Sequence, residues 1–291
     1  MYEFDSDRLE KLSLLRTSGV NPFPHGLRTT HSAADVLELN GERTNEELSE
    51  DSTRVVLAGR MLFKNEMGRA GFARIQDRSA RIQLYVKKNV IGEEDFTAIW
   101  KKLDLGDHLY VEGGLMRTRT GEATISVTRL VLASKCMSSL PDKWKGVADP
   151  EFKNRRRYVD LFMDAESRET FRRRSLIVRR IRQFFEERDF LEVETPMMQA
   201  IPGGAAARPF TTHHNALDLE LYMRVAPELY LKRLVVGGFE RVFEINRNFR
   251  NEGVSTQHNP EFTMVEFYQA SATWEDLMDI TREMIPSNNQ K

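Results

Sequence analysis

The chain carries two kinds of hydrophobic pattern, and they occupy different stretches. Between residues 53 and 132, apolar and polar positions alternate in five segments, which predicts five β-strands. These segments are 53–63, 71–77, 80–86, 108–116 and 122–132, and a helical pattern over 92–106 separates the third from the fourth. Five strands with a helix after the third predict an OB-fold barrel, whereas the rival five-stranded SH3-like barrel lacks that helix.

Helical periodicity dominates outside this stretch. Residues 5–19 predict a short amphipathic helix, and residues 20–52 are polar and irregular. A segment at 135–155 with two prolines and no period predicts a linker. Beyond it the pattern predicts, in order, a helix at 165–188, a strand that ends at Pro196, a helix at 227–238, strands at 243–249 and 260–269, and a helix at 274–285.

These elements predict an α+β multidomain protein. We expect an N-terminal helix and extension at 1–52, an OB-fold β-barrel at 53–134, the linker at 135–155, and a second domain with an antiparallel sheet and flanking helices at 156–291.

Composition limits the function classes. The 291 residues are 40% hydrophobic, which suffices for ordinary cores, and a formal net charge of -1 gives no global attraction to nucleic acid. Cys136 is the lone cysteine, so an intrachain disulfide is excluded, and no Cys/His set has zinc spacing. No apolar run approaches transmembrane length. We therefore expect a cytoplasmic protein in a reducing compartment, with no membrane partner and no bound metal of the Cys/His type.

Strand alternation assigns the barrel side chains to two faces. Phe72, Gln83 and Glu122 fall on the outward face, with Arg74 and Tyr85 beside them. An aromatic ring beside an amide, a carboxylate and arginines is typical of a surface that stacks and reads nucleobases. Basic residues between positions 64 and 88 would add a strip that attracts phosphate: Lys64, Arg69, Arg74, Arg78, Arg81, Lys87 and Lys88. The alternative is that Phe72 is a core residue at a strand edge and the arginines form a solvated face.

In the second domain, period two places Phe262, Met264, Glu266 and Tyr268 on one face of the last predicted strand. A glutamate among apolar neighbours is costly unless a cation meets it. Arg250 ends the preceding strand, and its planar fork suits a carboxylate or phosphate. Together these residues indicate a site for an amino acid and a nucleoside triphosphate.

Simpler explanations compete with this site. Arg250 and Glu252 would also suit a surface ion pair in a hairpin loop, Glu266 would also suit a core arginine, and the Gly/Ala-rich loop at 203–207 would also serve as a flexible connection. His258 is more often a plain polar residue than a ligand. The phosphate-loop, dinucleotide-binding and hydrolase motifs are absent from the sequence.

Longer stretches resemble a known family. FEINRNFRNEG, followed by HNPEFTMVEFYQA, resembles motif 2 of the class II aminoacyl-tRNA synthetases, and RDFLEVETPMM looks like their motif 1. The run from IPGGAAARPF to RNFRNEG is close to the lysyl-tRNA synthetases of the bacterial type, and so are the linker and the barrel segment ARIQLYV. The resemblance covers nearly the whole chain.

The resemblance implies a function and its residues. It implies a lysine–tRNA ligase, which activates lysine with ATP to lysyl-adenylate and transfers it to the 3′ end of lysine tRNA. Arg250 and Glu252 would be catalytic. The implied ATP-binding residues are Arg250, Glu252, His258, Asn259 and Phe262; the lysine-binding residues are Gly204, Glu228, Arg250, Glu266 and Tyr268; and the anticodon-binding residues are Phe72, Gln83 and Glu122.

The resemblance also implies Mg²⁺ alongside ATP, and a homodimer through motif 1, the helix and strand of 165–196 with Pro196. Nothing after motif 2 resembles the family's motif 3, so we expect a chain truncated before that motif, with few magnesium ligands. Two alternatives stay open at this point: a tRNA-binding fragment without catalysis, and a synthetase of the same subclass for aspartate or asparagine. Neither of those substrates explains why Glu266 and Tyr268 share a face.

Overall fold

The computed structural model describes residues 4–141 and 149–287. The middle of the predicted linker, 142–148, and the tail 288–291 lie outside the described residues. Contacts divide the chain into two compact units, residues 1–159 and 160–291, and each is described here by itself.

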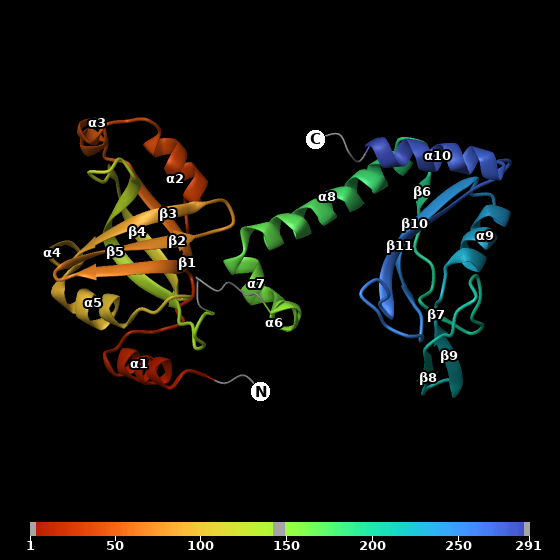
Figure 1. The fold of residues 1–291 in the computed structure, drawn as a ribbon, viewed down its shortest axis with the longest axis horizontal. Coiled ribbons are helices and arrows are strands. Elements are labelled where there is room, and N and C mark those ends of the chain that lie inside the picture. Colours follow the sequence, from red (N-terminus) through yellow and green to blue (C-terminus); the bar gives the residue numbers. More distant parts are fainter. Residues whose placement is uncertain (1–3, 142–148, 288–291) are drawn as a thin grey trace. The chain divides into compact units, whose positions relative to one another are not determined.

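The first unit contains a closed five-stranded barrel (Figure 1). Its strands are β1 (Arg54–Met67), β2 (Ala70–Gln76), β3 (Arg81–Lys87), β4 (His108–Arg117) and β5 (Ala123–Ser134). They are ordered β1-β2-β3-β5-β4, and β3 runs parallel to β5 while the other pairs are antiparallel. All five predicted strands and the OB-fold order are confirmed. The predicted helical stretch of 92–106 contains α5 (Glu93–Ala98) and a short 3₁₀ helix, η1 (Trp100–Lys102), and one further turn that was not predicted, α4 (Lys88–Ile91), precedes it.

The N-terminal extension is more ordered than predicted. Helix α1 (Ser6–Thr17) matches the prediction, with Asp5 as its cap. The stretch predicted as irregular contains α2 (Ala33–Asn40) and α3 (Asn45–Glu50), so that prediction was wrong. Both helices begin with a capping box, formed by Ser32 before α2 and by Thr44 before α3, which satisfies free backbone N–H groups at the helix start. The apolar stripe of such a short helix is too brief to predict it.

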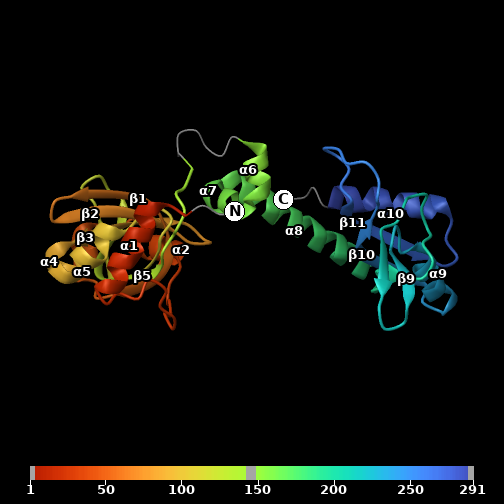
Figure 2. The same ribbon diagram turned by 90° about the horizontal axis from the view of Figure 1, so that it is seen from below.

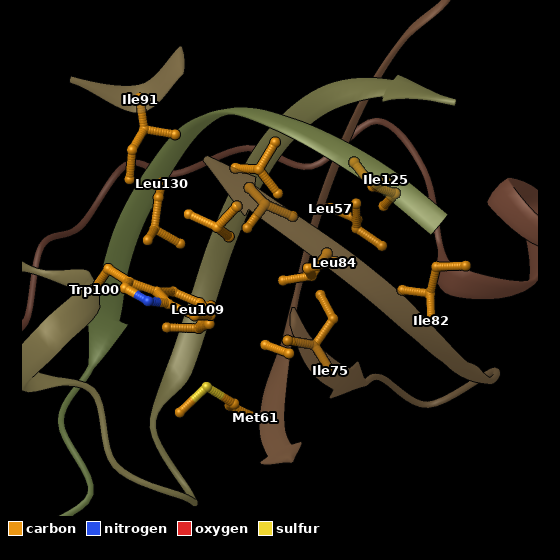
Figure 3. Close-up of a cluster of buried hydrophobic side chains, with 14 of the residues drawn as sticks. Leu57, Met61, Ile75, Ile82, Leu84, Ile91, Trp100, Leu109, Ile125 and Leu130 are labelled. Atoms are coloured by element: carbon orange, nitrogen blue, oxygen red, sulfur yellow. The ribbon is translucent and has the colours of Figure 1, made fainter. Parts of the chain in front are cut away.

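The barrel interior is one continuous apolar core (Figure 3). Inward side chains from every strand meet there, and η1 inserts Trp100, which is fully buried. The predicted inward residues of β2 and β3 are all buried, as alternation requires: Ala73, Ile75, Ile82, Leu84 and Val86. This core holds the outer face of β2, β3 and β5 in a fixed register.

A buried charge cluster closes one end of the barrel. Lys135 Nζ lies 2.6 Å from Asp104 Oδ2 and 2.8 Å from Asp107 Oδ2, and the side chains of Lys135 and Asp107 are fully buried. Burial raises the pKa of Asp107, although Lys135 opposes the shift. Lys11 of α1 joins the cluster at 2.5 Å from Asp104. Figure 1 shows α1 below the barrel, and Figure 2, seen from below, shows it in front.

The second unit is built on a β-hairpin. Its strands are β6 (Leu191–Glu192), β7 (Met198–Gln199), β8 (Thr211–His214), β9 (Leu219–Met223), β10 (Arg241–Phe249) and β11 (Glu261–Gln269), and its longer helices are α8 (Ala165–Glu186), α9 (Glu228–Val236) and α10 (Trp274–Ser287). The sheets are ordered β11-β10-β6 and β7-β9-β8. The three long helices and the hairpin strands are confirmed. The strand before Pro196 is only two residues long, because β6 meets β10 at just two positions.

The pattern missed several elements. Helix α6 (Pro150–Arg155) lies inside the predicted linker, and α7 (Arg157–Met163) follows it. Strands β8 and β9 were not predicted, because most of their residues are exposed and polar and apolar positions scarcely alternate in them.

The hairpin β10–β11 has two distinct faces. Phe243 and Phe267 pack with Phe185 of α8 on one face, beside α10 (Figure 1). Alternation then turns Glu244 and Glu266, which lie opposite each other in the register, toward the other face. Helix α9 packs on both hairpin strands. The hairpin therefore has an apolar face against α8 and a face that carries charged and amide side chains.

Candidate active site and nucleic-acid interface

The outer face of the barrel presents two parallel rows of side chains. The register places Phe63, Arg74, Gln83 and Thr124 side by side across β1, β2, β3 and β5. Two residues along each strand, a second row contains Phe72 and Tyr85, and the rows are about 7 Å apart. One row is thus mainly polar and the other is aromatic at its centre.

The aromatic row is a stack. The rings of Phe72 and Tyr85 have centroids 4.8 Å apart and planes inclined by 19°. Lys87 Nζ lies 4.9 Å from the Tyr85 ring centroid. Two parallel rings beside a cation suit base stacking next to a phosphate. Strand alternation predicts Tyr85 on the outward face, and its position two residues from Gln83 is the sequence signal for its place in this row.

The polar row is hydrogen bonded. Gln83 Nε2 donates to Thr124 Oγ1 at 3.1 Å, and Arg74 Nη2 lies 2.9 Å from Glu122 Oε1. Gln83, which alternation predicted on the outer face, is only 7% exposed, and Thr124, which the same alternation along β5 places on that face, is fully buried. They are on that face, but their mutual contact and their neighbours cover them. The sequence therefore predicted their face correctly and overestimated their exposure.

The predicted basic strip is incomplete. Lys64 lies opposite Ala73 in the register, so it belongs to the inward set, and it donates to the Trp100 carbonyl oxygen at 2.7 Å. Burial lowers the pKa of Lys64. Lys88 forms an ion pair with Glu93 at the end of the barrel. Lys64 is consequently not part of a phosphate-attracting surface, and that prediction was wrong for it.

On the charged face of the hairpin, Tyr268 donates a 2.8 Å hydrogen bond to Glu266 Oε1. Burial raises the pKa of Glu266, and the nearby carboxylates Glu228 and Glu244 raise it further. Burial and the bond to Glu266 also raise the pKa of the Tyr268 phenol. No cationic side chain of the described residues forms an ion pair with Glu266, and the nearby Lys232 is 2.5 Å from Glu228 instead. Glu266 and Tyr268 therefore form a half-buried site whose carboxylate a bound cation would stabilise.

A line of unpaired polar atoms runs along β10 on the same face. Among the described residues, no partner meets the buried atoms Asn246 Nδ2, Asn248 Oδ1 and Arg250 Nε. Buried polar atoms are normally hydrogen bonded, so three at alternate positions of β10 and of the residue that follows it indicate a surface that is completed by a ligand or further polar groups. The sequence analysis selected only Arg250. The signal for the two asparagines was their spacing, which places them on the face of Glu266.

The residues predicted around ATP lie at one end of the hairpin. The Arg250 guanidinium carbon lies 5.1 Å from the Phe262 ring centroid, so cation and ring form one surface. Glu252 accepts a 3.3 Å bond from the Arg208 amide, and His258 Nδ1 lies 2.9 Å from Ser255 Oγ. Asn259 is exposed in the same loop. The structure brings Arg250 and Phe262 together, and it places Glu252, His258 and Asn259 in the exposed connection between the strands.

Gly204 and Glu228 are direct neighbours. Gly204 has φ +88°, and a Cβ added there would lie 2.8 Å from Glu228 Cβ and 3.1 Å from Ala226 Cβ. Only glycine fits both this backbone conformation and this contact. The close approach sets the position of Glu228, whose charge is felt at Glu266 and Tyr268. Gly204, Glu228, Glu266 and Tyr268 are thus brought into one region of the second unit.

A buried ion pair anchors this face. Arg224 Nη1 lies 2.7 Å from Glu244 Oε1, with side chains 1% and 5% exposed, and Thr195 donates to Glu244 Oε2 at 2.7 Å. Arg224 also donates to the Arg247 carbonyl oxygen at 2.8 Å. These contacts fix β10 to the segment before Pro196, so they hold the register of the polar line.

Within 4–141 and 149–287, no group of three or more His, Cys, Asp or Glu side chains is placed to hold a metal ion. The described helices include none that is long and apolar enough to cross a membrane.

Two stretches of the chain match known protein families. Residues 149–290 match the family described as tRNA synthetases class II (D, K and N), and residues 55–133 match the family of OB-fold nucleic acid binding domains that is named for the tRNA anticodon. The chain belongs to the class II tRNA synthetases. In this member of the family, the OB-fold match corresponds to the barrel, and the synthetase match includes the hairpin β10–β11.

Curated relatives of this family member are lysine–tRNA ligases. The chain is 57% identical over 288 residues to lysine–tRNA ligase of Xylella fastidiosa (strain M23), covering 98% of this chain and 56% of that protein. It is 56% identical over 280 residues to the ligase of Idiomarina loihiensis, with 96% and 56% covered, and 52% identical over 278 residues to that of Magnetococcus marinus, with 96% and 55% covered. The chain therefore spans a little over half the length of these relatives.

Proposed function

We propose that this chain takes part in the ATP-dependent attachment of lysine to lysine tRNA, with the hairpin face of 156–291 as its lysine and ATP site and the barrel of 53–134 as its anticodon reader. The observation that carries this proposal is the hydrogen-bonded pair of Glu266 and Tyr268, in which a half-buried carboxylate forms no ion pair with any described cationic side chain. The lysine ammonium would supply that cation. Charging would take place in the cytoplasm, as expected for a translation enzyme.

The charge of the pocket favours lysine over the other substrates of the subclass. Glu228 and Glu244 act electrostatically on Glu266, and among the described residues Glu244 alone of the three has a buried cationic partner. An acidic side chain such as aspartate would add a further negative charge, and asparagine would leave Glu266 unpaired. Lysine would be bound by Glu266 and Tyr268 at its side chain and by Gly204 and Glu228 near its α-amino group.

The chemistry would rest on positioning and charge neutralisation. The lysine carboxylate would attack the ATP α-phosphorus, the bond to pyrophosphate would break, and the adenylate would then be passed to the tRNA 3′ hydroxyl. Arg250 would bridge the carboxylate and the α-phosphate, and Phe262 would stack on adenine. Glu252, His258 and Asn259 would complete the ATP site, so Arg250 and Glu252 are the proposed catalytic residues. Mg²⁺ would accompany ATP; among the described residues, no group of three or more His, Cys, Asp or Glu side chains is placed to hold a metal ion.

Anticodon binding would use both rows of the barrel face. Phe72 offers a ring for stacking, while Gln83 and Glu122 offer an amide and a carboxylate to base edges. Support comes from their shared face, the stack with Tyr85, and the position of Arg74 beside Glu122.

We also propose a homodimer through residues 165–196. Leu176 and Ile177 on α8 are 42% and 46% exposed, and Met198 beyond Pro196 is 54% exposed. A hollow of about 580 Å³ on α8 is lined by Leu161, Phe171 and Leu176 together with arginines. Exposed apolar side chains of this density on one helix are typical of an interface.

Lysine-dependent ATP–pyrophosphate exchange tests the proposal, with aspartate and asparagine as competitors. Exchange that depends on lysine alone, and that disappears in Glu266→Gln, is the expected result. Exchange with aspartate or asparagine but not lysine would overturn the substrate. Binding of lysine tRNA with no exchange for any amino acid would instead support the alternative of a tRNA-binding chain without catalysis.

A further inference from the structure

The side-chain amide of Gln83 lies near the centre of the barrel's outer face, and its neighbour Thr124 determines which way round the amide is held. The Thr124 hydroxyl donates its hydrogen to the Glu122 carbonyl oxygen, 2.9 Å away. Because a hydroxyl has a single hydrogen, Thr124 Oγ1 is left only as an acceptor toward Gln83. The 3.1 Å contact between Thr124 and the Gln83 amide must therefore use the amide nitrogen.

The opposite orientation of the amide is disfavoured. It would place Gln83 Oε1 against Thr124 Oγ1, so that two acceptors would face each other. Thr124 is fully buried and Gln83 is 7% exposed, so little water is present to separate two such atoms. The amide is consequently held one way round, with its nitrogen toward β5.

This orientation leaves the Gln83 oxygen available. Among the described residues, no donor is hydrogen bonded to Gln83 Oε1, although Arg74 lies opposite Gln83 in the register. The guanidinium of Arg74 is bound to both carboxylate oxygens of Glu122, at 2.9 and 3.2 Å. Next to this acceptor lies the stack of Phe72 and Tyr85, where a base would rest.

We propose that Thr124 is a specificity-determining residue of the anticodon site, an inference that rests on the proposed tRNA-binding function. By fixing the Gln83 amide, Thr124 makes the barrel present an acceptor to the central position of a base edge. Uracil and guanine carry an imino N–H there, whereas adenine and cytosine carry a ring nitrogen that is itself an acceptor. The site therefore selects imino donors, and the lysine anticodon ends in uracils because lysine codons begin with adenines.

The test is fluorescence anisotropy of the full chain with labelled lysine anticodon stem-loops. Each anticodon uridine is replaced in turn by cytidine, which exchanges the imino donor for an acceptor. We expect one replacement to weaken binding to the wild-type chain about tenfold. Thr124→Val keeps the shape but removes the hydroxyl, so its discrimination at that position should fall to about twofold, while Thr124→Ser should retain it. Undiminished discrimination in Thr124→Val would overturn the inference.

A second measurement needs no variant and covers the case in which Thr124→Val does not fold. N3-methyluridine at the sensitive position removes the imino hydrogen, and the wild-type chain should lose about the same tenfold. Equal binding of both uridines would contradict the inference. If the wild-type chain binds lysine stem-loops no better than an unrelated hairpin, the proposed function fails as well. A preference for lysine stem-loops that is indifferent to N3 methylation and to Thr124 removes only this inference.

Discussion

The Tyr268 hydroxyl lies 2.8 Å from Glu266 Oε1, and it donates its hydrogen to a carboxylate that no described cationic side chain pairs with. The two residues are two positions apart on β11, so both side chains leave the same face of the strand. An ionised, half-buried carboxylate without a paired cation lowers the stability of the ligand-free protein, and a bound ammonium would stabilise it. Stability and lysine binding should therefore respond in opposite directions to its removal.

The first prediction concerns Glu266→Gln. Because burial raises the pKa of Glu266, the folded chain binds this proton more tightly than the unfolded chain. Ionisation then lowers the free energy of unfolding as pH rises above the ordinary carboxyl pKa. We expect Glu266→Gln to raise Tm by about 2–4 °C at about pH 8 and to leave it unchanged near about pH 4, where both forms are neutral.

Differential scanning fluorimetry across this pH range checks the prediction. Glu275→Gln, at an exposed carboxylate of α10, is the matched control and should change stability by less than about 0.5 kcal/mol at either pH. If Glu266→Gln melts at a lower temperature than the wild type at high pH, the ionised carboxylate of Glu266 does not destabilise the fold.

The second prediction separates two adjacent glycines. Gly204→Ala combines a positive φ with a Cβ 2.8 Å from Glu228 Cβ, so we expect it to cost about 1–3 kcal/mol and to weaken lysine binding. Gly203→Ala meets only the flexible end of Leu229, at 2.7 Å, and should cost less than about 1 kcal/mol. Urea denaturation and lysine titration of both variants measure this. Equal losses in both would mean that the contact with Glu228 is unimportant.

The third prediction tests the charge cluster of the barrel. Lys135→Met leaves Asp107 buried without its cation, so we expect a loss of about 3–5 kcal/mol in the free energy of unfolding. Lys88→Met breaks a pair with Glu93, whose side chain is 80% exposed, and should cost no more than about 1 kcal/mol. Urea denaturation followed by tryptophan fluorescence compares them. Similar small losses would argue that Asp107 becomes protonated without consequence.

The fourth prediction tests the aromatic row. Phe72→Ala removes the ring that stacks at 4.8 Å on Tyr85, and we expect affinity for lysine anticodon RNA to fall about tenfold to a hundredfold. Tyr85→Phe retains both rings and should bind within about twofold of the wild type. Anisotropy titrations at one fixed salt concentration are required, because phosphate contacts vary with ionic strength. Unaltered binding by Phe72→Ala would exclude this face as the reader.

Most of the fold could be predicted from the periodicity of apolar positions in the sequence. The five barrel strands, the hairpin and the long helices have strong periods, and the barrel order follows from their sequence. The elements that the sequence pattern did not predict depend on local contacts. Helices α2 and α3 are short and depend on the caps Ser32 and Thr44, and β6 and β7 are two-residue pairings defined by their neighbours. Such contacts are not visible in the hydrophobic periodicity of a single sequence.

The candidate sites show a different limit. Alternation placed Glu266 with Tyr268 and Phe72 with Gln83 correctly on shared faces, but it does not report which side chains bind one another. The pairing of Gln83 with Thr124, the inward position of Lys64 and the unpaired atoms Asn246 Nδ2 and Asn248 Oδ1 become apparent only when the register is known. The roles of the site residues remain proposals that the variants above test.

The most direct test of the central claim is isothermal titration calorimetry of this chain with lysine, norleucine and aspartate, in wild-type and Glu266→Gln forms. Norleucine preserves the aliphatic chain and lacks the side-chain ammonium, so it isolates the contact with Glu266 and Tyr268. We predict that wild-type protein binds lysine alone and that Glu266→Gln loses at least about tenfold in lysine affinity. Equal binding of lysine and norleucine, or lysine affinity unchanged in Glu266→Gln, would contradict the claim that this pair recognises the lysine side chain.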